Sequence, residues 1–529
     1  RPGEVTFRSK GELFDHPNIE EKRIGTQKLQ EQHSKLEQGN PQIKDLIEWI
    51  AFPDPHSEKT SSFKPGSVPG VKTEINHIQN LTKITNHEFL YPKVIGLLND
   101  VYMPLAVPFM EKLQLLIVED KERLDALVVD IASFGGHMIA ELSKIPTIIN
   151  SPTLLPTLSS SNYPSWGSGY RTGMTWWESC LNIFQPRILS VGLTQPFLAY
   201  NRIRWSVGLN PLLSFNLGFA KAVSVNTAQG FDYPRDTGKN VYFTGWLGTR
   251  GTGGAAVKEW CGDSPCVYVN LGYMPQMSRH HAKTIVQGIS RARTEFSYLA
   301  SEACGEKPRE DCEYLRGLSS LKAVWVVPAN QFGALPPLLP KFIKALSRKG
   351  GETVYGHLTS GPTFLASVSH CGLQAAQSSL VASVPLLCVP FFGDQTDVAA
   401  RVADAGAGLE IKAKDITASS VADSLISIAM GRAEGGDTDG EVGYGPNTFL
   451  AGSRLLEPGG ADLFESLIAS IKAGSIEPVV ERRPVRYGFE GYAVVFGLLC
   501  VISAVGSVAL RFGWKLWTGR ALGPETSRE

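Results

Sequence analysis

Two polar clusters within residues 364–408 have the residue types and spacing needed to bind a phosphorylated ligand. An apolar strand predicted over 364–369 ends at the run His-Cys-Gly, and a helix is predicted from Leu373 to Ala382. His370 and the amide of Gly372 would then stand at a helix N-terminus, where free N–H groups and the helix dipole favour an anion. This cluster suits a diphosphate.

The second cluster follows a short strand predicted over 386–389, which stops at Pro390. Its exit loop presents Asp394 and Gln395 before a helix predicted over 396–405. A carboxylate beside an amide can accept and donate hydrogen bonds to vicinal hydroxyls, as found on a sugar. For each cluster the alternative is a helix cap that binds no ligand.

Both clusters depend on the elements that position them. Short apolar strands alternate with helices along the chain, which predicts an α/β fold with parallel, helix-covered sheets. Ligands of such sheets bind at the carboxyl ends of neighbouring strands, so the two clusters should face one crevice. A small-residue and Gly-rich stretch at 249–257 predicts a flexible linker between two domains.

The order of residues from 370 to 401 resembles the signature of UDP-glycosyltransferases. The shared features are His-Cys-Gly at 370–372, Val-Pro at 384–385, Pro390, Gly-Asp-Gln-Thr-Asp at 393–397 and Ala-Arg at 400–401. Residues 225–227, 241–245 and 267–274 are similar to other strands of that family. The resemblance implies a GT-B fold, in which two Rossmann-like domains enclose a cleft. It implies an acceptor-binding domain at 1–248, a nucleotide-sugar-binding domain at 258–455, and a C-terminal helix with a juxtamembrane segment at 456–490.

The resemblance also assigns site residues. Those expected at the donor are Gly272, His370, Gly372, Gln374, Ser378, Asp394 and Gln395. Asp130, at the end of a predicted strand, matches the Asp that orients the family's catalytic histidine, although a loop or helix-cap Asp is the alternative. That histidine belongs to a first strand and Gly-His turn, whereas Arg1 to Phe7 resembles the second strand, so we expect the base to precede this sequence. His137 is expected to be a packed or surface residue.

Several positions depart from the family pattern. Ser378 stands where a Glu usually binds the ribose, Gln374 and Ala375 replace an Asn and a Ser, and Tyr273 replaces another Ser. No Trp-x-Pro-Gln run precedes the signature, and Tyr355 is the nearest aromatic residue. Uridine is therefore implied by the resemblance alone. The alternative is a non-catalytic, membrane-anchored protein that keeps a GT-B body for binding.

The implied reaction is an inverting transfer of a hexose or hexuronic acid from a UDP-sugar to a hydroxyl of a small lipophilic acceptor. No cofactor or metal is expected, and no Cys spacing fits a zinc site. The aromatic residues between 159 and 177 either line the acceptor pocket or anchor a long loop.

Composition excludes some partners. Lys plus Arg and Asp plus Glu each number 51, so no net field attracts nucleic acid. Eight cysteines form no dense framework; Cys261 with Cys266, and Cys304 with Cys312, could close small loops or stay reduced.

Residues 491–510 form an uncharged apolar run, long enough to span a bilayer as one transmembrane helix, with a buried core helix as the alternative. The tail at 511–529 would lie on the far side. One N-glycosylation acceptor sequence, Asn-Leu-Thr at 80–82, fits a lumen. The family implies a body in the endoplasmic reticulum lumen or another secretory compartment, and a homo-oligomer is compatible with it.

Overall fold

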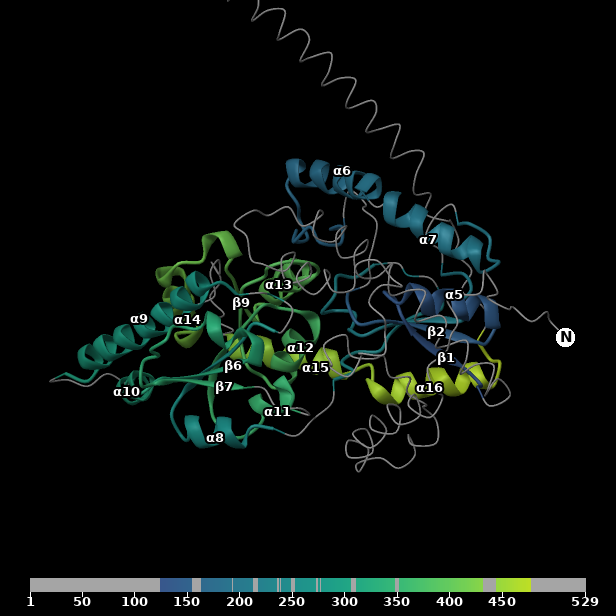
Figure 1. The fold of residues 1–529 in the computed structure, drawn as a ribbon. Coiled ribbons are helices and arrows are strands. Elements are labelled where there is room, and N and C mark those ends of the chain that lie inside the picture. The colour runs from purple at the N-terminus through teal and green to yellow at the C-terminus, as the bar shows by residue number, and fades with distance from the viewer. Residues whose placement is uncertain are drawn as a thin grey trace, which may run out of the picture.

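The structure is a computed structural model, and it describes residues 124–476 apart from 155–162, 193, 213–216, 236, 238, 249–252, 273–274, 276, 306–310, 348–351 and 432–443. The described residues form two halves, each built on a parallel sheet (Figure 1). The predicted α/β class with parallel, helix-covered sheets is confirmed.

The N-terminal half has four parallel strands in chain order. They are β1 (Leu127–Asp130), β2 (Thr147–Ser151), β3 (Ala222–Val225) and β4 (Val241–Phe243). The helices here are α5 (Phe134–Ser143), α6 (Trp176–Gly192) and α7 (Thr194–Ser206). Successive strand residues point to opposite faces, so Ile148 and Ile149, although adjacent, belong to different core clusters.

The C-terminal half has six parallel strands in the order β10-β9-β8-β5-β6-β7. They are β5 (Cys266–Asn270), β6 (Lys322–Val327), β7 (Ile343–Ser347), β8 (Phe364–Ser369), β9 (Leu386–Cys388) and β10 (Gly408–Glu410). Counted from β5, this is the 3-2-1-4-5-6 order of a nucleotide-binding sheet. The order reverses between β5 and β8, and a ligand crevice is expected at their carboxyl ends.

Helices cover both faces of this second sheet (Figure 1). On one face pack α9 (Arg279–Ala303), α10 (Cys312–Ser319) and α14 (Ala418–Ala429). On the other pack α8 (Ala255–Cys261), α11 (Val354–Leu358), α12 (Leu373–Val381), α13 (Gln395–Asp404) and α15 (Tyr444–Leu456). Two short 3-10 helices, η4 (Ala329–Ala334) and η5 (Ala413–Asp415), complete the described secondary structure.

Among the described residues the chain crosses between the halves twice, and the two crossings lie side by side. The first follows β4, and the second follows α15 and leads into α16 (Ala461–Lys472). Trp246 N on the first donates at 2.9 Å to Leu455 O in the last turn of α15, where the second begins. Helix α16 then packs on β2 and β3, where Leu467 and Ile471 share a core with Ile148. The last described helix therefore belongs to the N-terminal half (Figure 1).

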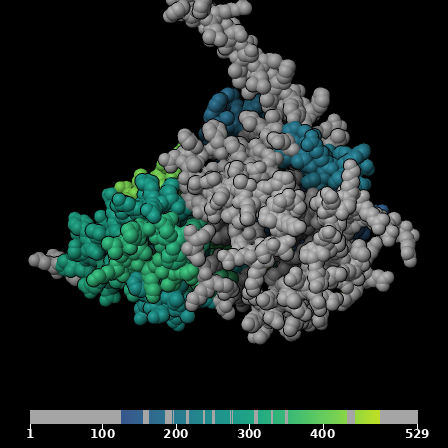
Figure 2. Space-filling model, in the orientation of Figure 1, coloured from purple at the N-terminus to yellow at the C-terminus, as the bar shows by residue number. Residues whose placement is uncertain are grey.

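Two expectations about loops were wrong in part. The last three residues of the predicted linker, 255–257, are the first turn of α8, because their small and apolar side chains suit a helix whose Val257 is buried. The aromatic stretch ends earlier than expected, since Trp176 and Trp177 begin α6. Trp176 is 77% exposed there, and α6 and α7 lie on the outside of the molecule (Figure 2).

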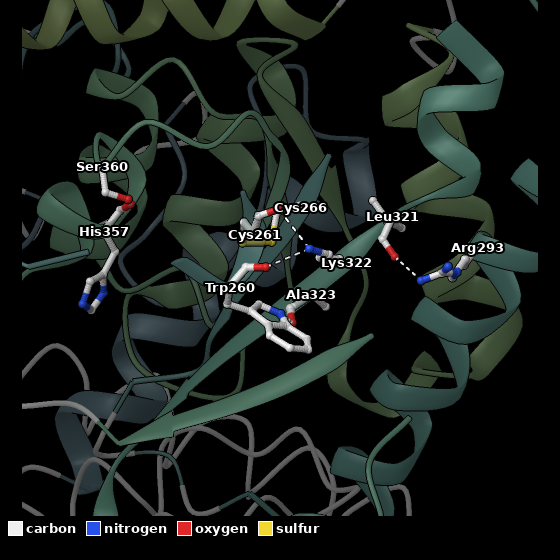
Figure 3. The surroundings of a disulfide bond; sticks show 9 residues. All are labelled: Trp260, Cys261, Cys266, Arg293, Leu321, Lys322, Ala323, His357 and Ser360. Carbon is white, nitrogen blue, oxygen red and sulfur yellow. Dashed lines mark hydrogen bonds between the residues drawn. A yellow bond between two sulfur atoms is a disulfide. The ribbon is translucent and has the colours of Figure 1, made fainter. Parts of the chain in front are cut away.

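Three disulfides join described cysteines. Cys261–Cys266 closes α8 onto β5, and around it Trp260 Nε1 donates to Ala323 O at 2.9 Å and Lys322 Nζ to Trp260 O at 3.0 Å (Figure 3). Cys304–Cys312 follows α9. Of the alternatives left open for these two pairs, the structure has the disulfides. A third bond, Cys371–Cys388, was not anticipated.

The apolar run at 491–510, the glycosylation sequence at 80–82, the resemblance of residues 1–7 to a strand, and Tyr273 all lie outside the described residues. Within the part of the chain that is described, no helix is both long and apolar enough to cross a bilayer.

Candidate functional site

His370 lies at the point where the strand order of the six-stranded sheet reverses. It follows β8, whose last residue Ser369 pairs with Asn270, the last residue of β5. The ring fits between two glycines: a Cβ on Gly272 would be 2.7 Å from His370 Cε1, and one on Gly372 would be 2.6 Å from Nε2. Any side chain at either glycine would displace the imidazole, so both positions require glycine while His370 keeps this place.

The electrostatic state of His370 follows from its surroundings. Burial lowers the pKa of the imidazole to about 4, because desolvation disfavours the charged ring, while a hydrogen bond to the Asn270 backbone opposes the shift. The ring is therefore neutral at pH 7. Its Nδ1 is buried and has no hydrogen-bond partner among the residues described. A polar atom left in this state is a place where a ligand atom can be bound.

The loop that holds His370 is supported by a buried polar chain. Gly272 N donates to Asn270 Oδ1 at 2.9 Å, and Asn270 Nδ2 donates to Tyr268 Oη at 3.4 Å. Tyr268 Oη lies 2.9 Å from His357 Nδ1 on α11. These contacts fix the turn after β5, where Gly272 has φ of +74°.

Helix α12 begins directly after His370, with Gly372 as its N-cap. No side chain caps this end, so the first-turn N–H groups remain available to an anion. Cys371 has φ of +58° and is tied to Cys388 at the end of β9 by the third disulfide. The predicted anion site therefore lies at a helix N-terminus, and the loop before it is covalently linked to the next strand.

The two other predicted donor residues on α12 lie on different sides of the helix. Gln374 is exposed, whereas Ser378 is only 4% exposed and faces the core. In this conformation a ribose could reach Gln374 but not the Ser378 hydroxyl. Tyr355, the nearest aromatic residue to the expected base platform, packs on Trp246 with ring centroids 4.9 Å apart.

Asp394 and Gln395 begin α13, after β9. Thr153, from the loop after β2 in the other half, donates its hydroxyl to Asp394 Oδ2 at 2.6 Å. Burial raises the pKa of the Asp394 carboxyl, and the Thr153 hydrogen bond opposes this. Gln395 Oε1 accepts from the backbone N of Phe391 and Phe392 at 2.9 and 3.2 Å, so this side chain holds the turn that carries it. Its amide nitrogen is the group left for a ligand.

Asp130 ends β1 with an exposed side chain whose Oδ1 accepts from Ala132 N at 2.8 Å. This is a local turn contact. His137 on α5 is buried beside Phe134 and Phe219, and burial lowers its pKa to about 4. The prediction of a packed histidine is confirmed.

The sequence interpretation missed the contacts that α13 makes with the N-terminal half. Asp397 Oδ1 and Oδ2 accept from the backbone N of Gly169 and Gly167. Arg401 Nε donates to the buried Asp232 at 3.0 Å. Asp397 and Arg401 belong to the signature, but nothing in the sequence pairs them with residues about 170 to 230 positions away.

No group of three His, Cys, Asp or Glu side chains within the described ranges could hold a metal ion. The polar groups that converge here are instead a neutral imidazole, free helix N–H groups and carboxylates. Together they can bind a phosphorylated, hydroxyl-bearing ligand.

Parts of this chain are similar to known proteins. A family model described as UDP-glucoronosyl and UDP-glucosyl transferase matches residues 354–432. UDP-glycosyltransferase 84A1 of Arabidopsis thaliana is 28% identical over 156 residues, which are 28% of this chain and 26% of the relative. Myricetin 3-O-rhamnosyltransferase UGT77B2 of Crocosmia x crocosmiiflora is 27% identical over 172 residues, 30% of this chain and 36% of the relative. The chain thus spans 26% and 36% of the length of these curated relatives.

Two solved structures with low identity are also similar. The glycotransferase of kitacinnamycin has a TM-score of 0.47 at 16% identity, over 72% of this chain and 82% of that one. UDP-glucose: anthocyanidin 3-O-glucosyltransferase in complex with UDP has a TM-score of 0.46 at 16% identity, with the same coverage of 72% and 82%.

The proteins that this chain matches by sequence are all sugar transferases. The matched segment, 354–432, contains His370, Asp394 and Asp397, and through it the chain is similar to the UDP-glycosyltransferase family.

Proposed function

We propose that this protein transfers a hexose or hexuronic acid from a UDP-sugar to a hydroxyl of a small lipophilic acceptor. The observation that carries the proposal is His370, held between two glycines at the strand-order reversal with an unpaired, buried Nδ1. The uncapped N-terminus of α12 follows it directly. A diphosphate fits this combination because it supplies both negative charge and hydrogen-bond acceptors.

The sugar is assigned to the first turn of α13. Asp394 Oδ1 and the Gln395 amide nitrogen are the groups available for vicinal hydroxyls, because the Thr153 hydroxyl already donates to Asp394 Oδ2. The strands before the two loops, β8 and β9, are neighbours in the sheet, with Ser369 opposite Cys388. Phosphate and sugar groups of one donor can therefore extend along one edge of the sheet.

The reaction we propose is a single displacement with inversion and without a metal. The acceptor oxygen attacks the anomeric carbon, its proton passes to a general base, and the nucleoside diphosphate leaves toward His370 and α12. General-base assistance is worth about 10²- to 10⁴-fold. Asp130 is proposed to support this base through its exposed carboxylate. The three disulfides favour an oxidising compartment, and residues 491–510 are the proposed membrane anchor.

The test is calorimetric titration of the full chain with UDP, UMP and a UDP-sugar. We expect UDP to bind more tightly than UMP, His370→Ala to weaken UDP by at least roughly tenfold through loss of a charge-assisted contact, and EDTA to change nothing. His280→Ala is the matched control, because His280 is exposed on α9.

Asp394→Asn should weaken the UDP-sugar and leave UDP unchanged, since UDP lacks the sugar. If neither UDP nor a UDP-sugar binds to the wild-type chain, the donor site is refuted and a non-catalytic binding protein becomes the better interpretation.

A further inference from the structure

Helix α13 carries two polar sets. Its N-cap Asp394 and its first residue Gln395 are assigned above to the sugar. Asp397, also in the first turn, and Arg401, one turn later, are both buried and both contact the N-terminal half. The same rigid element thus touches the donor side and the acceptor side of the molecule.

Asp397 binds one short loop with both carboxylate oxygens. Oδ2 accepts from Gly167 N at 2.5 Å and Oδ1 from Gly169 N at 2.8 Å. Gly169 has φ of +64°, and a Cβ added there would be 3.0 Å from Thr396 Cβ. The loop backbone therefore lies directly on α13, and this close approach requires glycine.

Arg401 and Asp232 fasten the start of the same loop. Arg401 Nε donates to Asp232 Oδ1 at 3.0 Å and Nη1 to Asp397 O at 3.0 Å. Tyr163, at the start of the loop, donates its hydroxyl to Asp232 Oδ1 at 3.3 Å. At the far end, Arg171 lies 3.5 Å from Asp404. Residues 163–171 are thus attached to α13 at three places.

The loop carries groups that a ligand could use. Trp166 Nε1 is buried without a hydrogen-bond partner in the described part of the chain, and so is Thr396 Oγ1, on the α13 side of the contact. Tyr170 is half-buried in the same loop. An indole N–H with no acceptor can donate to an oxygen of a bound molecule.

We propose that Asp397 is a positioning residue for the acceptor: its carboxylate holds the 163–171 loop, with Trp166 and Tyr170, against the helix whose first turn binds the donor sugar. The inference rests on the proposed function, because it concerns the acceptor of that reaction. Binding of UDP should not need this contact, since His370 and Gly372 lie on other elements.

The test compares hydrogen exchange of the full chain in wild-type, Asp397→Ala, Asp397→Asn and Gly169→Ala forms, with UDP binding measured in parallel. In Asp397→Ala both loop amides lose their acceptor, so exchange within 163–171 should accelerate by roughly tenfold or more. UDP affinity should stay within about twofold, because its contacts are elsewhere. Asp415→Ala, in the exposed turn η5, is the matched control.

Gly169→Ala should also accelerate exchange within residues 163–171, because it disturbs the same contact from the loop side. If Asp397→Ala accelerates exchange throughout the chain, Gly169→Ala becomes the variant that tests the contact. His370→Ala should do the reverse, weakening UDP binding by at least roughly tenfold without loosening the loop. Once an acceptor is known, Asp397→Asn should raise its KM several-fold with little change in the donor KM. Unchanged loop exchange in both Asp397→Ala and Gly169→Ala would overturn the inference. Absence of UDP binding in the wild-type chain would instead reject the proposed function. The exchange measurement would still show whether Asp397 holds the 163–171 loop.

Discussion

At the scale of single residues, His370 presents a chemical puzzle. Its ring already contacts the Asn270 backbone, and its pKa is lowered to about 4, so Nδ1 of the neutral ring has a lone pair rather than a proton. A phosphate oxygen is an acceptor and needs a donor. To donate to it through Nδ1 and keep the hydrogen bond to the Asn270 backbone, the ring must gain a proton.

This leads to a prediction about proton linkage. At pH 7, binding of UDP should take up as much as about one proton, because an anion beside the imidazole raises its pKa. Calorimetry in buffers of different ionisation enthalpy measures the uptake. His370→Ala should abolish it and His280→Ala should not. Binding with no uptake in the wild-type chain would mean that the helix amides alone hold the phosphate.

A second residue-scale prediction concerns stability against pH. The pKa of His370 falls from 6.5 to about 4 on folding, so its contribution is present above pH 6.5 and is lost as the pH falls toward 4. The pKa of Asp397 rises from 3.8 to about 6 because burial outweighs the effects of Arg401 and the loop amides, and nearby Asp394 raises it further. Its contribution is present below pH 3.8 and is lost as the pH rises through 6.

The contributions of His370 and Asp397 to the free energy of unfolding change with pH in opposite directions. Each changes by about 3 kcal/mol between its two pKa values. Urea unfolding of the full chain between pH 4 and 6.5 should therefore separate them by substitution. His370→Gln should leave a variant whose stability relative to wild type improves as the pH falls. Asp397→Asn should show the opposite trend. Parallel curves for both variants would show that neither group titrates in this range.

The positions of several residues of the proposed donor cluster were predictable from local sequence. His370 and Gly372 are adjacent to the strand and helix that place them, so their position followed from short-range patterns. Thr153 was not predictable, since it contacts Asp394 across 241 positions and a lone Thr after a strand carries no signal. Ser378 was assigned to the ribose by family position, but the amphipathic rotation of α12 directs it inward.

At the scale of elements, helix α15 packs closely on α12 through one glycine. A Cβ on Gly452 would be 2.2 Å from Leu380 O, whereas one on Gly445, in the first turn of the same helix, would meet nothing within 4 Å. Neither glycine has a positive φ. The two positions therefore differ in packing and share a backbone conformation.

Gly452→Ala should destabilise the C-terminal half by about 1–3 kcal/mol, because the two helix backbones must separate. Gly445→Ala should change stability by less than about 1 kcal/mol, since the added Cβ meets no neighbour and the helix preference of alanine is offset by the restriction that Pro446 places on the residue before it. Thermal unfolding followed by circular dichroism measures both. Equal effects at the two sites would show that α12 and α15 do not approach as described.

Strands surrounded by turn residues were the most predictable elements. β8 has the predicted bounds of 364–369, because an apolar run is ended sharply by His-Cys-Gly. Helix α9 runs on to Ala303 through a second half that is polar, with only Ala292, Phe296, Ala300 and Ala303 buried. Such a sparse apolar stripe gives no clear helical signal in the sequence.

At the scale of the whole molecule, α16 is far in sequence from the sheet it covers. The resemblance implies a helix within 456–490, but the sequence does not show which surface that helix covers. Leu467 and Ile471 pack against β2 and β3, and Lys472 lies 2.7 Å from Asp125. The N-terminal sheet is thus covered on one face by the end of the described chain.

Leu467→Ala should therefore destabilise the N-terminal half by about 2–5 kcal/mol, as expected for a leucine removed from a core. Leu456→Ala, whose side chain is 50% exposed, should change stability by less than about 0.5 kcal/mol. Hydrogen exchange resolves the two halves. Faster exchange should appear in β2 and β3 rather than in β5 and β8, and the reverse pattern would place α16 elsewhere.

The paired crossings between the halves have a mechanical consequence. Trp246 N donates to Leu455 O. A Cβ on Gly245 would be 2.5 Å from Leu455 O, and one on Gly460 would be 2.7 Å from Trp246 O, so neither position has room for a side chain. Two connections fixed side by side form a hinge, which permits rotation of the halves about one axis and resists sliding or twisting. Spin-label distances across the molecule should vary along a single arc, while labels beside the axle keep a constant separation. The proposed donor and acceptor surfaces would then separate and return to the same relative position each time the hinge opens and closes.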